Sequence, residues 1–221
     1  MDRDTRVGMT LLELVVVLAM IGALLAFAGS TVSGWSKDQR AATSARSVAD
    51  AFNLARAEAI RTGSNFIVAF RIEPGLGGVT SDIVIANDGP PGTSDCTIAA
   101  SEIVESASLE QDVRFGTSPG LSNGTAAPND SGASGHQSIG SSFTDGTNPA
   151  AAASWVMFFA DGLPRRFTDP GAPPCTAIGP VGAGGGAIYV TNGRRDYAVV
   201  LSPLGVSRVH RWNTSAGAWT Q

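Results

Sequence analysis

Two serines of this chain lie in a pattern that can carry a catalytic nucleophile, and two histidines are candidates for the base. Ser118 and Ser122 each stand at the centre of a Gly-x-Ser-x-Gly segment, the pattern that carries the nucleophile of many hydrolases. That nucleophile needs a strand before it and a helix after it, whereas the residues here are rich in Pro, Asn and Gly and predict a loop. Neither His136 nor His210 is placed by spacing to act as the base. The sequence therefore predicts that the protein is not an enzyme.

Metal and cofactor motifs are also missing from the sequence. Cys96 and Cys175 fit no zinc-ligand spacing, and the acidic residues match no calcium loop. The glycine-rich segment 182–187 opens a strand-like run, so it cannot form the phosphate site of a helix N-terminus. We therefore expect no metal and no cofactor. The two cysteines either form one disulfide, in an oxidising compartment, or remain two buried thiols.

The charge limits how the chain could bind nucleic acid. It has 221 residues, with 15 basic and 19 acidic side chains and a net charge of −4. This balance excludes a surface that is basic throughout, but not a local basic patch. Four late arginines are candidates for such a patch, with Trp212 beside them as a stacking platform: Arg194, Arg195, Arg208 and Arg211. Alternatively they are solvated charges that prevent strand edges from pairing.

The N-terminal region contains an apolar run that predicts a membrane-spanning helix. Residues 9–28 carry a single charge, Glu13, and 20 helical residues span roughly 30 Å, the thickness of a bilayer core. A secretory signal peptide has a shorter apolar region, and here helical sequence continues past the run. A carboxylate in such a span costs on the order of 2.5–3.5 kcal/mol. Glu13 therefore either reaches the headgroups or meets a positive partner in an assembly.

The rest of the chain predicts an α+β fold. In residues 41–61 small and apolar residues recur every three or four positions, which indicates an amphipathic helix ended by Gly63. Joined to the apolar run, it makes one helix of about 50 residues, roughly 75–80 Å long. Short strands with short turns then favour an antiparallel sheet. The predicted strands are 66–72, 82–86, 103–104, 113–115, 155–159, 187–191, 197–201 and 206–212. The polar stretch 116–153 is either a functional loop or mobile.

The residues from Gly8 to Ala19, GMTLLELVVVLA, resemble the processing signal of type IV prepilins and type II secretion pseudopilins. The resemblance implies cleavage between Gly8 and Met9 by the prepilin peptidase, methylation of the Met9 amine, and an assembly role for Glu13 as the fifth mature residue. Met9 replaces the usual Phe, and no Pro kinks the helix near residue 30. The implied localisation is the bacterial inner membrane, single-pass, with the C-terminal domain periplasmic and filament-associated after assembly.

Three further segments resemble the GspH/FimT family of minor pilins: 54–63, 155–162 and 197–209. The family implies a pilin fold, in which a long N-terminal helix packs on an antiparallel β-sheet domain. The implied parts are a leader at 1–8, a transmembrane helix at 9–29, the periplasmic half of that helix at 30–62, and a β-rich domain at 63–221.

The resemblance implies a structural subunit that joins, initiates or caps a type II secretion pseudopilus or a type IV pilus. Its partners would be the prepilin peptidase, the other pilins of the filament and the inner membrane. Some FimT-type pilins also bind DNA through a Gly-Arg-x-Arg motif, and DNA uptake is the alternative function. Here the matching segment, 205–211, has no Arg directly after Gly205.

Overall fold

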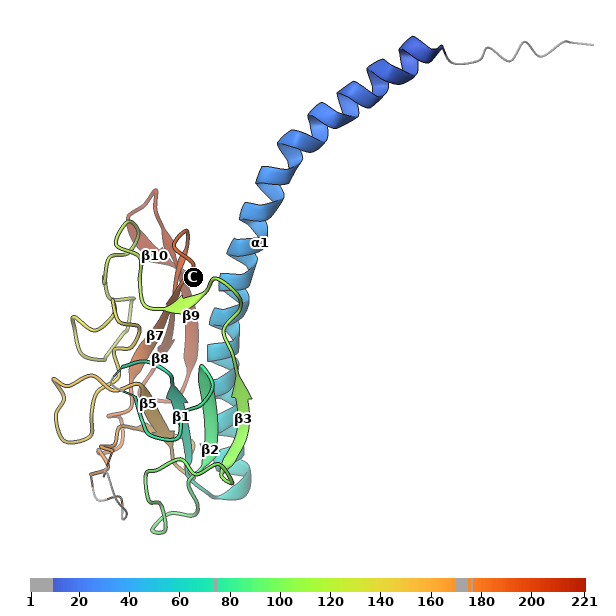
Figure 1. Cartoon of the computed structure of the whole chain (residues 1–221). Helices are drawn as coiled ribbons and strands as arrows, with labels where there is room; N and C mark the ends of the chain where they lie inside the picture. The colour runs from blue at the N-terminus through green and yellow to red at the C-terminus, as the bar shows by residue number, and fades with distance from the viewer. Residues whose placement is uncertain (1–9, 74, 170–174, 176) are drawn as a thin grey trace, which may run out of the picture. The chain divides into compact units, whose positions relative to one another are not determined.

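The computed structural model describes residues 10–73, 75–169, 175 and 177–221; within these, the side chains of 25–33 are not described. The described part of the chain forms one α-helix followed by ten short strands (Figure 1). Contacts divide the chain into two units, Met1–Lys37 and Asp38–Gln221. The fold is therefore α+β, as the sequence predicts.

Helix α1 runs from Leu11 to Thr62 and has 52 residues, which confirms the prediction of one helix of about 50 residues. At its start the hydroxyl oxygen of Thr10 accepts the backbone N–H of Glu13 at 3.3 Å, the bond that an N-cap residue makes. At its end the N–H of Gly63 donates to the carbonyl of Ala59 at 3.0 Å. Gly63 has a φ of 69°, which glycine adopts without strain.

Among the described residues, no helix combines the length and apolar character that crossing a membrane requires. The predicted span at 9–29 is thus not found there. Its first residue and the side chains at its C-terminal end lie outside the described part.

The strands form two five-stranded antiparallel sheets instead of the single sheet that the sequence predicts. The first has the order β3-β2-β1-β5-β6 and the second the order β10-β9-β8-β7-β4. Their bounds are β1 Phe66–Phe70, β2 Ile83–Asn87, β3 Ile103–Ala107, β4 Arg114–Phe115, β5 Trp155–Phe158, β6 Pro164–Arg165, β7 Gly186–Thr191, β8 Asp196–Leu201, β9 Ser207–Asn213 and β10 Ala218–Thr220. The predicted hairpin at 66–86 is confirmed as the pair β1 and β2.

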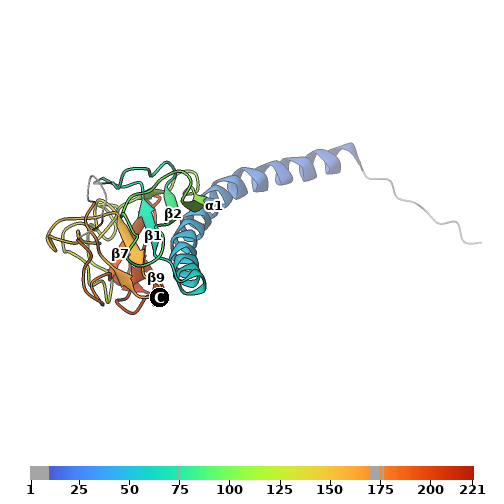
Figure 2. The same ribbon diagram turned by 90° about the horizontal axis from the view of Figure 1, so that it is seen from below.

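The main core lies between the sheets and the part of α1 that belongs to the second unit. The predicted small and apolar stripe of the helix is fully buried there, from Ala45 to Ala59. Phe52 stands at its centre, with ring contacts to Phe70, Phe143 and Phe158. Figure 2 shows this part of the helix on one side of the strands and the long loops on the opposite side.

The polar stretch 116–153 is anchored to the second sheet by buried side chains. Asp196 is 0% exposed, and its carboxylate accepts the backbone N–H groups of Ser118 and Ser122 and the Ser122 hydroxyl. The hydroxyl of Tyr189 donates to Asp130 at 2.6 Å. These bonds hold parts of the stretch against the second sheet.

Candidate functional site

The predicted processing residues, Gly8 and Met9, lie outside the described residues. Glu13 lies in the first turn of α1, where the partial positive charge of the helix N-terminus favours an anion. The apolar residues around it are exposed: Leu11 is 80% exposed, Leu12 75% and Leu24 70%. Exposed apolar side chains on all faces of a helix are unfavourable in water. The described side chains of this segment therefore leave apolar surface exposed on every face of the helix.

Three of the four predicted arginines gather at one end of the second sheet. Arg194 and Arg195 lie in the turn between β7 and β8, where the side chain of Asn192 accepts both backbone N–H groups, at 2.9 and 2.8 Å. Arg211 on β9 pairs in register with Tyr197 on β8. Turn geometry and strand register thus bring together residues that are up to 17 positions apart in the sequence.

Helix α1 adds an acidic and a basic side chain to this group. The Nε atoms of Arg194 and Arg195 lie 3.6 and 3.3 Å from the two carboxylate oxygens of Asp38. Arg46 lies close enough to interact electrostatically with Tyr197, as do Arg195, Arg211 and Asp38. We name these residues the arginine cluster: Asp38, Arg46, Arg194, Arg195, Tyr197 and Arg211.

The electrostatics of the arginine cluster favour anions. Burial raises the pKa of Tyr197, and the nearby arginines Arg211 and Arg195 oppose that rise. The cluster contains four guanidinium groups and one carboxylate, so it keeps an excess of positive charge after Asp38 is paired. Arg46 and Arg211 are exposed and accessible to a phosphate backbone.

Arg208, the fourth predicted arginine, does not belong to this cluster. Side chains alternate between the faces of a strand, so Arg208 and Arg211 on β9 project from opposite faces. Arg208 pairs with Val200, which belongs to a small apolar cluster separate from the core under α1. The structure therefore does not bring all four arginines into one patch, and the two-residue period of a strand already predicts this separation.

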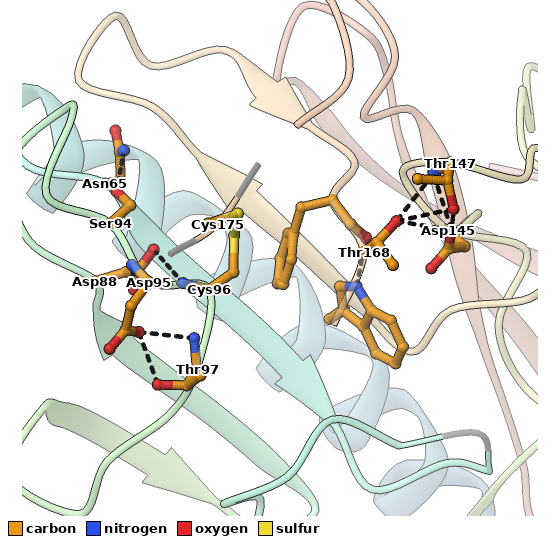
Figure 3. The surroundings of a disulfide bond; sticks show 12 residues. Asn65, Asp88, Ser94, Asp95, Cys96, Thr97, Asp145, Thr147, Thr168 and Cys175 are labelled. Carbon is orange, nitrogen blue, oxygen red and sulfur yellow. Dashed lines mark hydrogen bonds between the residues drawn. A yellow bond between two sulfur atoms is a disulfide. The ribbon is translucent and has the colours of Figure 1, made fainter. Parts of the chain in front are cut away.

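Cys96 and Cys175 form a disulfide across 79 positions of sequence, with their Cα atoms 5.2 Å apart (Figure 3). Of the two alternatives for the cysteines, the structure has the bonded form. Disulfides persist in oxidising compartments and are rare in the cytosol.

A pair of carboxyl groups lies beside the disulfide (Figure 3). The carboxylate of Asp88 accepts the backbone N–H groups of Asp95 and Cys96, each at 3.1 Å. Burial raises the pKa of Asp88 to about 7, and contact with the Asp95 side chain adds to the rise. The Thr97 hydroxyl donates to Asp95 and lowers the pKa of that carboxyl. Nothing in the sequence pattern distinguishes Asp88 from the other turn aspartates.

The described residues include no group of three or more His, Cys, Asp or Glu side chains placed to hold a metal ion. Ser122, one of the two serines with a hydrolase-like pattern, is 1% exposed and donates its hydroxyl proton to Asp196 at 2.5 Å. Its hydroxyl anchors the loop and is not presented to solvent.

Comparison of the chain with family models, curated proteins and solved structures finds no match.

Proposed function

We propose that the chain is a minor pilin or pseudopilin, a structural subunit that joins, initiates or caps a filament derived from the inner membrane. The observation that carries this proposal is that the two parts of α1 differ in the burial of their apolar side chains. From Ala45 to Ala59 the helix buries its stripe against the sheets, whereas from Leu11 to Leu24 it exposes apolar side chains. The exposed part would pack against lipid before assembly and against the helices of neighbouring subunits in the filament. A pilin needs an apolar helix for both environments.

The prepilin-like motif at residues 8–19 suggests how the chain is processed and how it assembles. In this proposal, the peptidase removes residues 1–8 and methylates Met9, while Glu13 attracts the amino terminus of an adjacent subunit. Two opposite charges about 4 Å apart interact by roughly 4 kcal/mol at an effective dielectric constant of 20. That attraction is comparable to the cost of a carboxylate in a membrane-spanning helix, so the pair would set the register of the subunits. The disulfide supports the proposed periplasmic location of the second unit.

The test separates processing from assembly. Glu13→Gln and Glu13→Ala variants should be cleaved, with an intact mass that begins at Met9, but should co-purify poorly with the other pilins. Glu105→Gln, an exposed carboxylate on β3, is the matched control and should assemble like the wild type. Wild-type recovery of both Glu13 variants would contradict the assembly role.

A second candidate function is DNA binding by the arginine cluster. The observation that favours it is the convergence of Arg46, Arg195 and Arg211 around Tyr197, since several adjacent cations are what a phosphate backbone requires. In a gel shift with double-stranded DNA, Arg195→Ala combined with Arg211→Ala should weaken binding and reduce its salt dependence. Arg208→Ala, on the opposite face of β9, is the matched control. Equal loss in both variants would contradict the cluster as the binding surface.

A further inference from the structure

Strand β9 carries two basic side chains on the face of the second sheet that is turned away from α1. Arg208 and His210 are two positions apart and project from the same face. Their register partners on β8 are Val200 and Ala198, which belong to the apolar cluster outside the main core. Charge and apolar surface therefore occur side by side on this face.

A groove of about 520 Å³ opens over these residues. One wall is Pro128 and Asn129 of the long loop, and the other is the β8–β9 turn from Ser202 to Val206. Leu204 in that turn is 69% exposed, and two prolines and two valines add to the apolar lining: Pro128, Pro203, Val200 and Val206. The volume lies in the range of sites that hold small ligands or peptide side chains.

His210 lines this groove and has an unsatisfied ring nitrogen. The residue is 2% exposed, and its Nε2 atom is buried without a hydrogen-bond partner among the described residues. Burial, together with the positive charge of Arg208, lowers the pKa of His210. Buried polar atoms without partners are rare in folded proteins, so the imidazole is a polar feature of the groove that the protein itself does not satisfy.

Arg208 supplies the charge of the groove. It is exposed, and within the described ranges no acidic side chain forms an ion pair with it. Asp130 is the acidic residue next to the loop wall, but its oxygens already accept bonds from Gly132, Ser142 and Tyr189. The groove thus presents a cation that its own surroundings do not neutralise.

We propose that this groove binds a segment of a partner protein in which a carboxylate side chain stands next to an aliphatic one. The carboxylate accepts the charge-assisted hydrogen bonds of Arg208 and lies next to His210, which lines the same groove. The aliphatic side chain packs on Val200, Leu204 and Val206, which removes apolar surface from water. Nucleic acid requires several phosphate contacts, and the groove offers one arginine, so the lining favours a peptide.

The proposal goes beyond filament assembly through α1 and does not depend on it. The experiment uses the full chain in detergent micelles and follows the ring protons of its two histidines by NMR. The probes are the peptides acetyl-Leu-Glu-Leu-amide and acetyl-Leu-Gln-Leu-amide, which differ only in the carboxylate. The glutamate peptide should shift the His210 signals in a saturable manner, leave those of His136 unchanged, and bind at least tenfold more tightly than the glutamine peptide.

Arg208→Gln should abolish the tenfold preference, because the cation that selects the carboxylate is lost. Arg114→Gln on β4, at the opposite edge of the same sheet, is the control and should retain it. Unchanged His136 signals in both variants report that the long loop is intact. Equal binding of the two peptides, or a preference that survives Arg208→Gln, overturns the proposal. If a DNA oligonucleotide shifts the His210 signals and the glutamate peptide does not, the groove binds nucleic acid and the proposal is overturned.

Discussion

Arg56 on α1 donates a hydrogen bond from Nη1 to the carbonyl oxygen of Gly205, 2.9 Å away, although 149 positions of sequence separate them. Gly162 lies at the same place: a Cβ atom on Gly205 would lie 2.9 Å from the Gly162 carbonyl oxygen, and one on Gly162 would lie 2.6 Å from the Ile60 side chain. The end of the helix, the β5–β6 turn and the β8–β9 turn therefore meet at one point.

The close approach at Gly205 predicts a stability loss larger than that of an ordinary turn glycine. Gly205 and Gly193 have similar φ values, 76° and 78°, but only Gly205 has atoms within 4 Å of an added Cβ. Gly193→Ala should cost about 1–2 kcal/mol from backbone strain alone, and Gly205→Ala about 1–3 kcal/mol more from overpacking. Urea unfolding of the two variants measures the difference in stability loss. Equal losses would contradict the prediction and show that Arg56 and Gly162 move aside at no cost.

The disulfide predicts a stability that depends on oxidation. Cross-linking residues 79 positions apart removes conformational entropy from the unfolded chain worth about 4.5 kcal/mol in the loop-closure treatment. Cys96→Ser combined with Cys175→Ser should lower the free energy of unfolding by about 2–5 kcal/mol. Unfolding should be measured with and without a reducing agent. The variant should not respond to the reductant, and a wild type that is also indifferent to it would contradict the prediction.

Asp88 predicts that the fold loses stability as the pH rises through its folded pKa. That pKa is raised from 3.8 to about 7, so between these values the folded state binds more protons than the unfolded state and the free energy of unfolding falls with pH. The loss amounts to at most about 4 kcal/mol across the window. Asp88→Asn stays neutral and should flatten the decline. Unfolding at pH 4.5, 6 and 7.5 measures it, and parallel curves for variant and wild type would exclude Asp88 as the cause.

If the chain is cleaved after Gly8, the precursor and the mature chain differ in mass by residues 1–8. Cleavage after Gly8 leaves 221 − 8 = 213 residues, and the peptidase must accept a residue without a side chain at the cut. Gly8→Leu should therefore leave the precursor uncut, while Val7→Leu, one position earlier, should be processed normally. Intact-mass measurement of the membrane fraction distinguishes the two, and a cleaved Gly8→Leu chain would argue against the pilin proposal.

Much of the fold could be predicted because its signals are local. The stripe from Ala45 to Ala59 and the stop at Gly63 place the end of α1, and runs such as 66–70 and 197–201 are visible as strands. The sequence does not predict β6 and β10: Pro164 lacks a backbone N–H group and disfavours a strand, and the three residues of β10 are too few to show a two-residue period. Two sheets formed where one was predicted, because β1 pairs with β5 and β4 with β7, neither a neighbour in sequence.

The candidate sites were less predictable because they depend on distant partners. Asp38 and Arg46 lie about 150 positions before the arginines that they join, and no sequence pattern links them. The order of the loop at 116–153 depends on Asp196, a charged residue whose burial cannot be predicted from its type. By contrast, the separation of Arg208 from Arg211 follows from the two-residue period of a strand and could have been foreseen.

The pairing of β1 with β5 also governs the order in which the chain can fold. Phe66 lies opposite Phe158, so the first sheet cannot close until 92 further residues have been synthesised. The β1–β2 hairpin is local and forms early. The other edge of β1, with its apolar side chains, then remains unpaired until β5 is made, and unpaired strand edges can pair with other chains. Nascent chains that end before Trp155 should therefore be aggregation-prone, and folding should be slow because its decisive contacts are non-local.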